Sequence, residues 1–365
     1  MLVESFISTL REAGFGPFTG VPDSIFLPLV NYLEGCEESD NIICSSEGEA
    51  MGLAGGFALA NRVPVVYMQN DGYGNAVNPL SSLQLTYELP ALLLISWRGE
   101  PGIKDAPQHH TMGETINGLL DLFDIPVEVL DPDDSRLNEK VEEARRHCSL
   151  TSLPYAFLIR KGTFSPVSSS GHQRVEADSL AQRYEYIRVL GRVTDEHSLF
   201  LGATGYCGRE LHQLIEGPNK FYMMGSMGCL ASVGLGLAKE NPGKRIYALD
   251  GDGALLMKMG TMSTVGYHAP ENLVHICFDN GEYESTGGQP TTSASTDFVE
   301  IARACQYRSA NAVSSPEEFE QVILNTQSNP GPHFICVEIA SGTLEDLPRP
   351  SESALVMARE FSRSL

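Results

Sequence analysis

The sequence predicts an α/β protein made of two doubly wound domains, each a parallel sheet with helices on both faces. The main observation is that short apolar, β-branched runs alternate with segments of helical period along the whole chain, which is typical of repeated βαβ units. The 365 residues are enough for two domains of ordinary size. A segment rich in serine and glycine at 168–172 separates two halves of similar rhythm. We therefore expect domains at 1–165 and 179–365, joined by a linker at 166–178.

The individual elements follow from these runs, since strands favour short β-branched segments and helices favour longer segments with apolar residues three or four apart. In the first half, strands are expected at 41–44, 64–69, 91–96, 127–130 and 155–160, and helices at 47–60 and 137–147. In the second half, strands are expected at 198–202, 220–224, 245–249, 274–278 and 333–339, and helices at 230–240, 254–267 and 316–326. Ligands collect at the carboxyl ends of parallel strands, so polar residues that follow the strands are the first candidates for a site.

The formal net charge of −22 argues against a nucleic acid or an anionic membrane as partner, because both need a basic face. It does not exclude a small anionic substrate, which needs only a few local cations or helix N-termini. The longest apolar stretch, near 89–96, is too short to span a bilayer. The eight cysteines form no C-x-x-C pair, which favours reduced thiols over zinc ligands or disulfides. We therefore expect a cytoplasmic protein.

A glycine-rich acidic turn follows the expected strand at 245–249. Gly251 and Gly253 let the backbone turn tightly, and Asp252 places a hard carboxylate oxygen beside the helix that opens at Ala254. A diphosphate needs such features, namely backbone N–H groups, the positive end of a helix dipole and a magnesium ion to bridge its oxygens. We expect Gly251, Gly253 and Ala254 to bind the diphosphate and Asp252 to bind the metal.

A second polar turn follows one helix and one strand later, after the expected strand at 274–278. The amide oxygen of Asn280 and the backbone carbonyl of Glu282 can join Asp252 on the same magnesium ion. By itself, Gly-Asp-Gly in a glycine-rich chain would indicate only a turn between a strand and a helix. The pair of turns, however, resembles the signature of thiamine-diphosphate-dependent enzymes, in which Gly-Asp-Gly is followed by Asn-Asn. Asp279 replaces the first asparagine here, but the usual ligand is the second position, Asn280.

This resemblance implies a glutamate that hydrogen-bonds the aminopyrimidine ring of the cofactor and so activates it. Glu47 is the candidate, because it follows an expected strand and opens an expected helix in the other half of the chain. A carboxyl group buried against the cofactor is expected to have a raised pKa, suited to sharing a proton with the ring. Without the resemblance, Glu47 would be explained as a helix N-terminal acid stabilised by the dipole.

The same resemblance assigns further cofactor contacts. The turn that contains Gly225 and Met227 is expected to place the methionine side chain under the cofactor, with the Gly225 carbonyl accepting from the pyrimidine amino group. Thr204 and Gly205 are expected beside the diphosphate. Gly74 and Asn75 are also expected to bind the cofactor.

Longer strings resemble the phosphonopyruvate decarboxylases, and sulfopyruvate decarboxylase is similar. These strings are 20–24, 67–80, 96–102, 107–109, 251–260 and 279–289. The resemblance implies two domains of the thiamine-diphosphate-binding type with no middle domain, and decarboxylation of 3-phosphonopyruvate to phosphonoacetaldehyde and CO₂ in phosphonate biosynthesis. The alternatives are sulfopyruvate decarboxylation, which gives sulfoacetaldehyde, and a non-catalytic module that only binds thiamine diphosphate.

Decarboxylation of a 2-oxo acid leaves a carbon that must be protonated, so a general acid is needed. His109 and His110 resemble the paired histidines of pyruvate decarboxylase, and His109 is the candidate for the proton transfer. Asp23 is a second candidate for moving protons or orienting water, although it could equally be a helix N-cap.

The anionic group of the substrate requires cations or donors near the same loop. Arg98 could hold a phosphonate through its guanidinium fork, and Lys104 lies in the same glycine- and proline-rich loop. Ser24 and His110 are the remaining candidates for substrate binding. No residue visibly selects a phosphonate over a sulfonate.

Other glycine-rich α/β enzymes are excluded by the motifs that they require. The chain contains no G-x-G-x-x-G string of the kind that binds a dinucleotide and no G-x-x-x-x-G-K-[ST] string of a P-loop. The resemblance also implies self-association into a dimer or a tetramer, with the active site between subunits.

Overall fold

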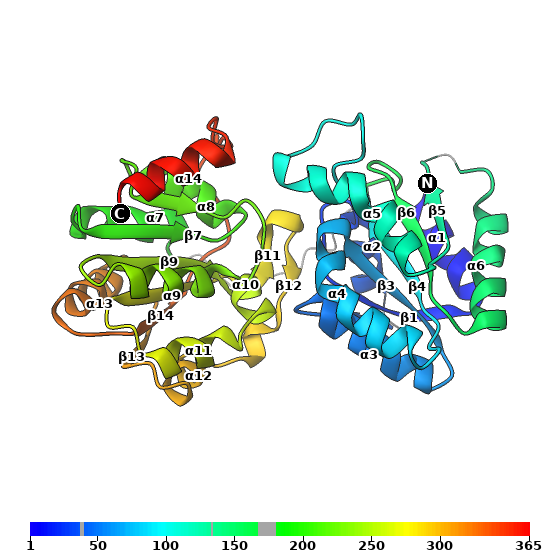
Figure 1. The fold of residues 1–365 in the computed structure, drawn as a ribbon, viewed down its shortest axis with the longest axis horizontal. Coiled ribbons are helices and arrows are strands. Elements are labelled where there is room, and N and C mark those ends of the chain that lie inside the picture. Colours follow the sequence, from blue (N-terminus) through cyan, green and yellow to red (C-terminus); the bar gives the residue numbers. More distant parts are fainter. Residues whose placement is uncertain (37–39, 133, 167–179) are drawn as a thin grey trace. The chain divides into compact units, whose positions relative to one another are not determined.

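Parallel strands flanked by helices make up both halves of the chain in the computed structural model, which describes all residues except 37–39, 133 and 167–179 (Figure 1). The chain divides into two compact units, Met1–Gln173 and Arg174–Leu365. We call them the first and the second domain and describe each by itself. The predicted linker at 166–178 lies almost entirely outside the described residues, so its position stays a prediction.

The first domain contains a sheet of six parallel strands in the order β2-β1-β3-β4-β6-β5. Its strands are β1 (Phe15–Gly20), β2 (Asn41–Ile43), β3 (Val63–Gln69), β4 (Leu92–Ser96), β5 (Val127–Leu130) and β6 (Tyr155–Ile159). Its helices are α1 (Val3–Glu12), α2 (Leu27–Glu34), α3 (Glu47–Leu59), α4 (Tyr73–Pro79), α5 (His110–Leu122) and α6 (Leu137–Thr151), with short helical turns η1 (Asn70–Gly72), η2 (Leu80–Leu85) and η3 (Pro107–His109).

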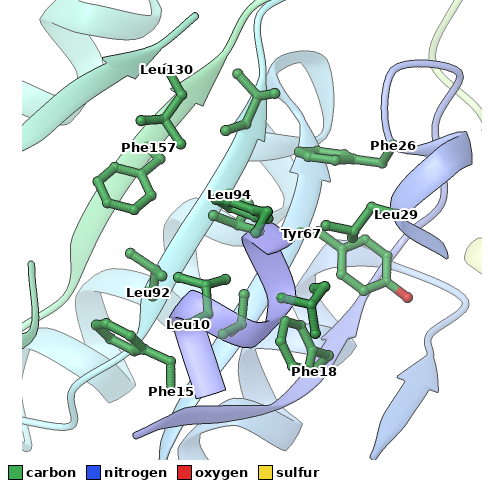
Figure 2. Close-up of a cluster of buried hydrophobic side chains, with 14 of the residues drawn as sticks. Leu10, Phe15, Phe18, Phe26, Leu29, Tyr67, Leu92, Leu94, Leu130 and Phe157 are labelled. Atoms are coloured by element: carbon green, nitrogen blue, oxygen red, sulfur yellow. The ribbon is translucent and has the colours of Figure 1, made fainter. Parts of the chain in front are cut away.

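Helices cover both faces of this sheet, because successive strand side chains point to opposite sides and both sides are apolar. In β3, Val65 and Tyr67 pack against α1, α2 and α6, whereas Val66 and Met68 pack against α3, α4 and α5. Figure 2 shows the first of these layers, in which Phe18, Leu94 and other side chains gather around Leu10 of α1. Full burial of one such side chain stabilises a fold by roughly 1.5–3 kcal/mol.

The second domain repeats this plan with the strand order β8-β7-β9-β10-β14-β13, again all parallel. Its strands are β7 (Ser198–Gly202), β8 (Lys220–Tyr222), β9 (Arg245–Gly251), β10 (Leu273–Asp279), β13 (Ser309–Val313) and β14 (His333–Glu338), and a small hairpin adds β11 (Glu282–Tyr283) and β12 (Gln289–Pro290). Its helices are α7 (Arg183–Val193), α8 (Tyr206–Leu214), α9 (Leu230–Glu240), α10 (Asp252–Met257), α11 (Thr261–His268), α12 (Phe298–Ala304), α13 (Pro316–Ser328) and α14 (Ala354–Arg363), with short helical turns η4 (Glu284–Thr286) and η5 (Thr292–Ser295).

Numbered along its own chain, each six-stranded sheet has the order 2-1-3-4-6-5. The chain therefore changes direction between strands 1 and 3, that is between β1 and β3 in the first domain and between β7 and β9 in the second. Ligands of doubly wound sheets bind at this switch point, outside the carboxyl ends of the strands. The predicted fold class is confirmed. The two domains share one topology, although no sequence repeat is visible between them.

Two strands and one helix differ from the sequence prediction, and several helices, among them α7, α8 and α14, were not predicted. The expectation had no strand at β1, where glycine and proline occupy three of six positions, or at β13, whose sequence Ser-Ala-Asn-Ala-Val is short and partly polar. The single helix predicted at 254–267 is two helices, α10 and α11, interrupted near Gly260. No helix in the described part of the chain is long and apolar enough to cross a membrane.

Candidate active site

Three consecutive residues of the first domain contact three of the predicted site residues. They form the turn η1, Asn70–Gly72, which directly follows β3 at the switch point. Asn70 is bonded to the backbone of Arg98, Asp71 to the ring of His109, and Gly72 lies against the side chain of Glu47. The carboxyl edge of the sheet therefore gathers residues that lie far apart in the sequence.

Glu47 is the first residue of α3 and is 5% exposed. The N-cap is Ser46, whose hydroxyl accepts a bond from the Glu49 backbone N–H, so Glu47 is not needed as the cap. Its carboxylate accepts a bond from the Asn75 amide at 2.8 Å. A Cβ atom on Gly72 would overlap the Glu47 carboxylate, so only glycine allows this close approach. Two predicted cofactor-binding residues, Glu47 and Asn75, are thus brought together.

Arg98 follows β4 and lies with its side chain largely buried. Its guanidinium group donates two bonds to the Asp105 carboxylate at 2.6 and 2.7 Å, and its third nitrogen donates to the Ser24 hydroxyl at 3.2 Å. The Asn70 amide bonds both the N–H and the carbonyl of the Arg98 backbone. Two predicted substrate-binding residues, Ser24 and Arg98, are therefore neighbours. The guanidinium fork that was expected to face a substrate is engaged by Asp105.

Asp105 is the counter-ion of this arginine. Burial opposes ionisation of Asp105, but bonds from Arg98 and from the Ala106 and Gly99 N–H groups hold the pKa of its carboxyl well below its usual range. The same pair raises the pKa of Arg98. The ion pair between Arg98 and Asp105 thereby holds the loop after β4 in place, so this part of it is not freely solvated.

His109 ends the turn η3 and is 8% exposed. Its Nδ1 atom lies 2.5 Å from a carboxylate oxygen of Asp71. The neighbouring His110 and Lys104 have exposed side chains at the rim of the same loop, and no side-chain contact to either is found within the described residues. The two adjacent histidines thus differ: the His109 ring is bonded to Asp71, whereas the His110 side chain is exposed to solvent.

Asp23 follows β1 and is 2% exposed. One of its oxygens accepts from the N–H groups of Ile25 and Phe26, and the other accepts from Ser96 and Gln69 side chains at 2.6 and 3.2 Å. Asp23 therefore ties the end of β1 to the ends of β3 and β4, but it is not the N-cap of α2, a position that Phe26 occupies. Whether it also moves protons stays a prediction.

A single threonine joins Asp252 to the turn that carries the other predicted metal ligands, Asn280 and Glu282. Asp252 is the first residue of α10 and is 2% exposed. The Thr291 hydroxyl donates to its carboxylate at 2.5 Å, and the Thr291 N–H donates to the Gly281 carbonyl at 2.9 Å. Thr291 thus joins the turn after β9 to the turn after β10, which are neighbouring strands in parallel register.

The carbonyl of Glu282 lies outside the hydrogen-bond ladder of its hairpin. Glu282 faces Pro290, and the flanking bond from Thr291 to Gly281 makes this a non-hydrogen-bonded pair. The Glu282 N–H donates to the Asn280 side-chain oxygen at 3.2 Å. The carbonyl is therefore available to a ligand, as the predicted metal site requires.

Asn280 is held by a buried ion network. Its amide nitrogen donates to Glu284 at 3.4 Å, and the same Glu284 oxygen accepts from Arg183 at 3.2 Å. Arg183 also donates to Glu210 at 2.7 Å, and Arg183 and Glu210 are almost completely buried. Because the amide nitrogen is engaged by Glu284, the Asn280 oxygen is the atom directed to the turn of Glu282.

The remaining predicted cofactor residues lie on loops that meet these turns. The Thr204 hydroxyl donates to the Met224 carbonyl at 3.0 Å, which joins the loop after β7 to the segment of Gly225 and Met227. A Cβ atom on Gly228 would lie 2.6 Å from the Lys258 side chain, and one on Gly253 would lie 2.5 Å from the Tyr283 ring. The loops after β7, β8, β9 and β10 therefore converge at one edge. They carry Thr204, Gly205, Gly225, Met227, Gly251, Asp252, Gly253, Ala254, Asn280 and Glu282.

The chemistry of Asp252 fits a bound cation. Burial raises the pKa of Asp252 to about 7, and the nearby Asp279 carboxylate adds to this effect, whereas the bond from Thr291 opposes it. No ion pair in the described part of the chain involves Asp252, so a cation would supply the missing positive charge. No cluster of three His, Cys, Asp or Glu side chains occurs among the described residues, so this metal would depend on amide and carbonyl oxygens as well.

Comparisons with known proteins agree with this arrangement. The family model "Thiamine pyrophosphate enzyme, N-terminal TPP binding domain" matches residues 2–119, and the model "Thiamine pyrophosphate enzyme, C-terminal TPP binding domain" matches residues 203–337. Phosphonopyruvate decarboxylase from Streptomyces viridochromogenes is 35% identical, with 97% of this chain and 92% of that protein covered. The chain belongs to the thiamine pyrophosphate-dependent decarboxylases. Thiamine pyrophosphate is the cofactor also called thiamine diphosphate, and the chain has both domains that bind it.

Other members of this decarboxylase family extend the comparison. Sulfopyruvate decarboxylase from Methanosarcina acetivorans is 30% identical, with 86% of this chain and 85% of that protein covered. Two further relatives, from Methanocaldococcus jannaschii, are named sulfopyruvate decarboxylase subunit alpha and subunit beta. Subunit alpha is 41% identical over 33% of this chain and 70% of its own length, and subunit beta is 37% identical over 40% of this chain and 76% of its own length.

Several residues that organise these sites were not singled out from the sequence. They are Asn70, Asp71, Gly72, Asp105, Arg183, Glu284 and Thr291. One signal could have found the first three, because polar residues directly after a buried strand mark a ligand edge. Asp105 and Thr291 follow no strand of the sheet. Asp105 pairs with Arg98 within one loop, whereas Thr291 contacts Asp252, which lies 39 residues earlier in the chain.

Proposed function

We propose that this protein decarboxylates 3-phosphonopyruvate to phosphonoacetaldehyde and CO₂, with thiamine diphosphate and Mg²⁺ as cofactors. The observation that carries the proposal is the full-length similarity to phosphonopyruvate decarboxylase, which extends over both domains and both candidate edges. A basic and hydroxyl-bearing pair, Arg98 and Ser24, lies at the edge of the first domain and suits an anionic substrate.

Each domain has its own task in this proposal. Asp252, Asn280 and the Glu282 carbonyl hold the magnesium ion, while the backbone of Gly251, Gly253 and Ala254 holds the diphosphate together with Thr204 and Gly205. Glu47, supported by Asn75, binds the aminopyrimidine ring. When bound, thiamine diphosphate supplies the electron sink that allows a 2-oxo acid to lose CO₂. Met227 would contribute an apolar contact to the cofactor.

The first domain also binds the substrate. Arg98 and Ser24 bind the phosphonate, and Lys104 and His110 at the exposed rim add positive charge when the substrate enters. His109 donates the proton that replaces CO₂, because it is the histidine held inside the loop. Asp23 keeps the ends of three strands in place beneath it.

A second candidate substrate is sulfopyruvate, because a sulfopyruvate decarboxylase of the same overall length also matches most of the chain. Both substrates are 2-oxo acids with a terminal anion. A phosphonate is mostly doubly ionised near neutral pH and a sulfonate carries a single charge. The two-charge anion suits a loop that contains both Arg98 and the exposed Lys104.

We also propose that the protein self-associates and that at least a dimer is the active unit. The proposal is supported by family membership and by two relatives named as subunits of one decarboxylase. Sedimentation at a series of concentrations, with activity measured in parallel, tests it. Full activity of a monomer at high dilution would overturn it.

The substrate proposal is tested with a panel of three 2-oxo acids. Protein, thiamine diphosphate and Mg²⁺ are incubated with phosphonopyruvate, sulfopyruvate or pyruvate, and aldehyde and CO₂ are measured over time. We expect kcat/KM to be highest for phosphonopyruvate. A preference for sulfopyruvate would favour sulfopyruvate decarboxylation, the second candidate function. A preference for pyruvate, which has no terminal anion, would contradict the proposed anion-binding role of Arg98.

A further inference from the structure

His109 is held by a carboxylate from a different segment of the first domain. Its Nδ1 atom lies 2.5 Å from Asp71 Oδ2, and the side chains are 10% and 29% exposed. Asp71 belongs to the turn η1, after β3, whereas His109 ends the turn η3, after β4. The contact therefore bridges two strand ends at the edge where the substrate is proposed to bind.

The chemistry of the pair determines which ring nitrogen is free. A carboxylate only accepts hydrogen bonds, so a short contact with Nδ1 requires the proton to be on Nδ1. The Nε2 atom of the neutral ring then carries a lone pair, and in the protonated ring it carries the second proton. The partner of one nitrogen thus decides the chemistry of the other.

We infer that Asp71 is a positioning residue, which orients His109 and fixes its Nδ1–H tautomer so that Nε2 exchanges the proton with the substrate-derived carbon. This inference rests on the proposed decarboxylase function. It adds to that function the atom that moves the proton and the residue that selects the atom.

The proton balance of the step is complete. His109 begins protonated on both nitrogens and transfers the Nε2 proton to the carbon that has lost CO₂. The electron pair left by the broken C–C bond forms the new C–H bond, and the N–H bond electrons remain on Nε2 as a lone pair. The Nδ1 proton stays on His109 throughout and donates its hydrogen bond to Asp71. Nε2 is then reprotonated from water.

The flanking residues support a role for Asp71 beyond anchoring a loop. Asn70 already anchors the strand end by bonding both backbone groups of Arg98, and Trp97 donates to the Gly113 carbonyl at 2.8 Å. The loop therefore has other attachments. The adjacent His110 is exposed and has no carboxylate contact among the described residues, so the carboxylate is provided for one histidine of the pair.

The tautomer can be measured directly in the holoenzyme without substrate. The protein is labelled with ¹⁵N-histidine, the His109 signals are identified from their loss in His109→Gln, and the ring is observed at a pH where it is neutral. We expect a protonated Nδ1 and an unprotonated Nε2. Wild-type protein with the proton on Nε2 would overturn the inference, whatever the substrate is.

The variant Asp71→Asn changes the partner without changing its shape. An asparagine can donate to Nδ1, which favours the opposite tautomer. We expect the Nε2 proton to appear and kcat to fall at least about 10²-fold, the size of a general acid–base contribution. KM and the affinity for thiamine diphosphate should stay near wild type. Asp121→Asn, an exposed carboxylate on α5, is the matched control and should change none of these.

The outcomes separate the two proposals. Unchanged tautomer and unchanged kcat in Asp71→Asn would overturn the role of Asp71, because a merely structural contact would affect neither. Wild-type protein that does not turn over phosphonopyruvate would overturn the proposed function, while the tautomer would still decide whether Asp71 orients His109.

Discussion

The two domains share one strand order but prepare their ligand edges in opposite ways. In the first domain Arg98 is paired with Asp105 and His109 with Asp71, whereas the buried carboxylates of Glu47 and Asp23 accept hydrogen bonds from neutral side chains. In the second domain Asp252 is buried with a neutral threonine as its hydrogen-bond partner, and its pKa is raised to about 7, chiefly by burial. The predicted substrate-binding residue Arg98 thus has a counter-ion, whereas the predicted metal ligand Asp252 has none among the described residues.

This difference indicates how one scaffold serves two tasks. The sheet delivers loops to the same switch point in both domains, and the residues after strands 1, 3 and 4 decide what the edge does. In the proposed function, paired charges keep the side chains that bind the substrate oriented before it arrives. The buried carboxylate of Asp252, which has no cationic partner among the described residues, is instead suited to the proposed Mg²⁺ site. Substitutions in either domain test this difference.

The largest effect is expected from Asp252→Asn, which removes the unbalanced charge of the second domain. Metal coordination is worth several kcal/mol, so we expect kcat/KM to fall at least about 10³-fold and binding of thiamine diphosphate with Mg²⁺ to weaken in calorimetry. Asp279→Asn is the matched control. It restores the asparagine of the family signature and should bind both ligands normally. Equal behaviour of the two variants would contradict the assignment of Asp252.

The next effect is expected from Gly72→Ala in the first domain. The new methyl group would overlap the Glu47 carboxylate and move it. A misplacement of about 1 Å at a reacting group can cost roughly 10²-fold in rate, so turnover should fall by that order. Gly118→Ala on α5, where a Cβ atom has open space, is the control and should leave turnover unchanged. Steady-state kinetics and circular dichroism separate a local from a global effect.

A smaller effect is expected from Glu284→Gln, which weakens the support of Asn280 without touching the proposed metal. Residues that orient a metal ligand typically contribute about 10–100-fold to metal affinity, and we expect the lower end because Arg183 keeps Glu210. Titration with Mn²⁺, followed by electron paramagnetic resonance, measures it. Glu300→Gln, an exposed pair with Arg303, provides the reference. A Mn²⁺ affinity equal to that of Glu300→Gln would show that Asn280 does not need Glu284 for its orientation.

The smallest effect is expected from Arg98→Lys, which keeps the charge but loses the fork to Asp105 and the bond to Ser24. We expect KM for phosphonopyruvate to rise about tenfold, equivalent to one charge-assisted hydrogen bond, with kcat little changed. Arg62→Lys, an exposed position, controls for the substitution itself. A fall in kcat at constant KM would place Arg98 in the chemical step instead of substrate binding.

The sequence was sufficient for the repeated α/β pattern and for the turns after β9 and β10, because these signals are local. It was not sufficient for β1, since Gly16, Pro17 and Gly20 indicate a turn although the surrounding strands enclose this segment in the sheet. The sequence also could not predict the pairs His109–Asp71 and Arg98–Ser24. They join residues 38 and 74 positions apart, and only the fold brings those strand ends together.

The central claim is that the first domain activates a cofactor that the second domain holds. The most direct test measures thiamine diphosphate affinity and turnover together in Glu47→Gln. The substitution keeps the shape of the side chain and a bond to Asn75, but the amide cannot share a proton with the pyrimidine ring. We predict near-normal cofactor affinity in the presence of Mg²⁺ and a loss of turnover of at least about 10²-fold. Turnover that survives the substitution would contradict the claim.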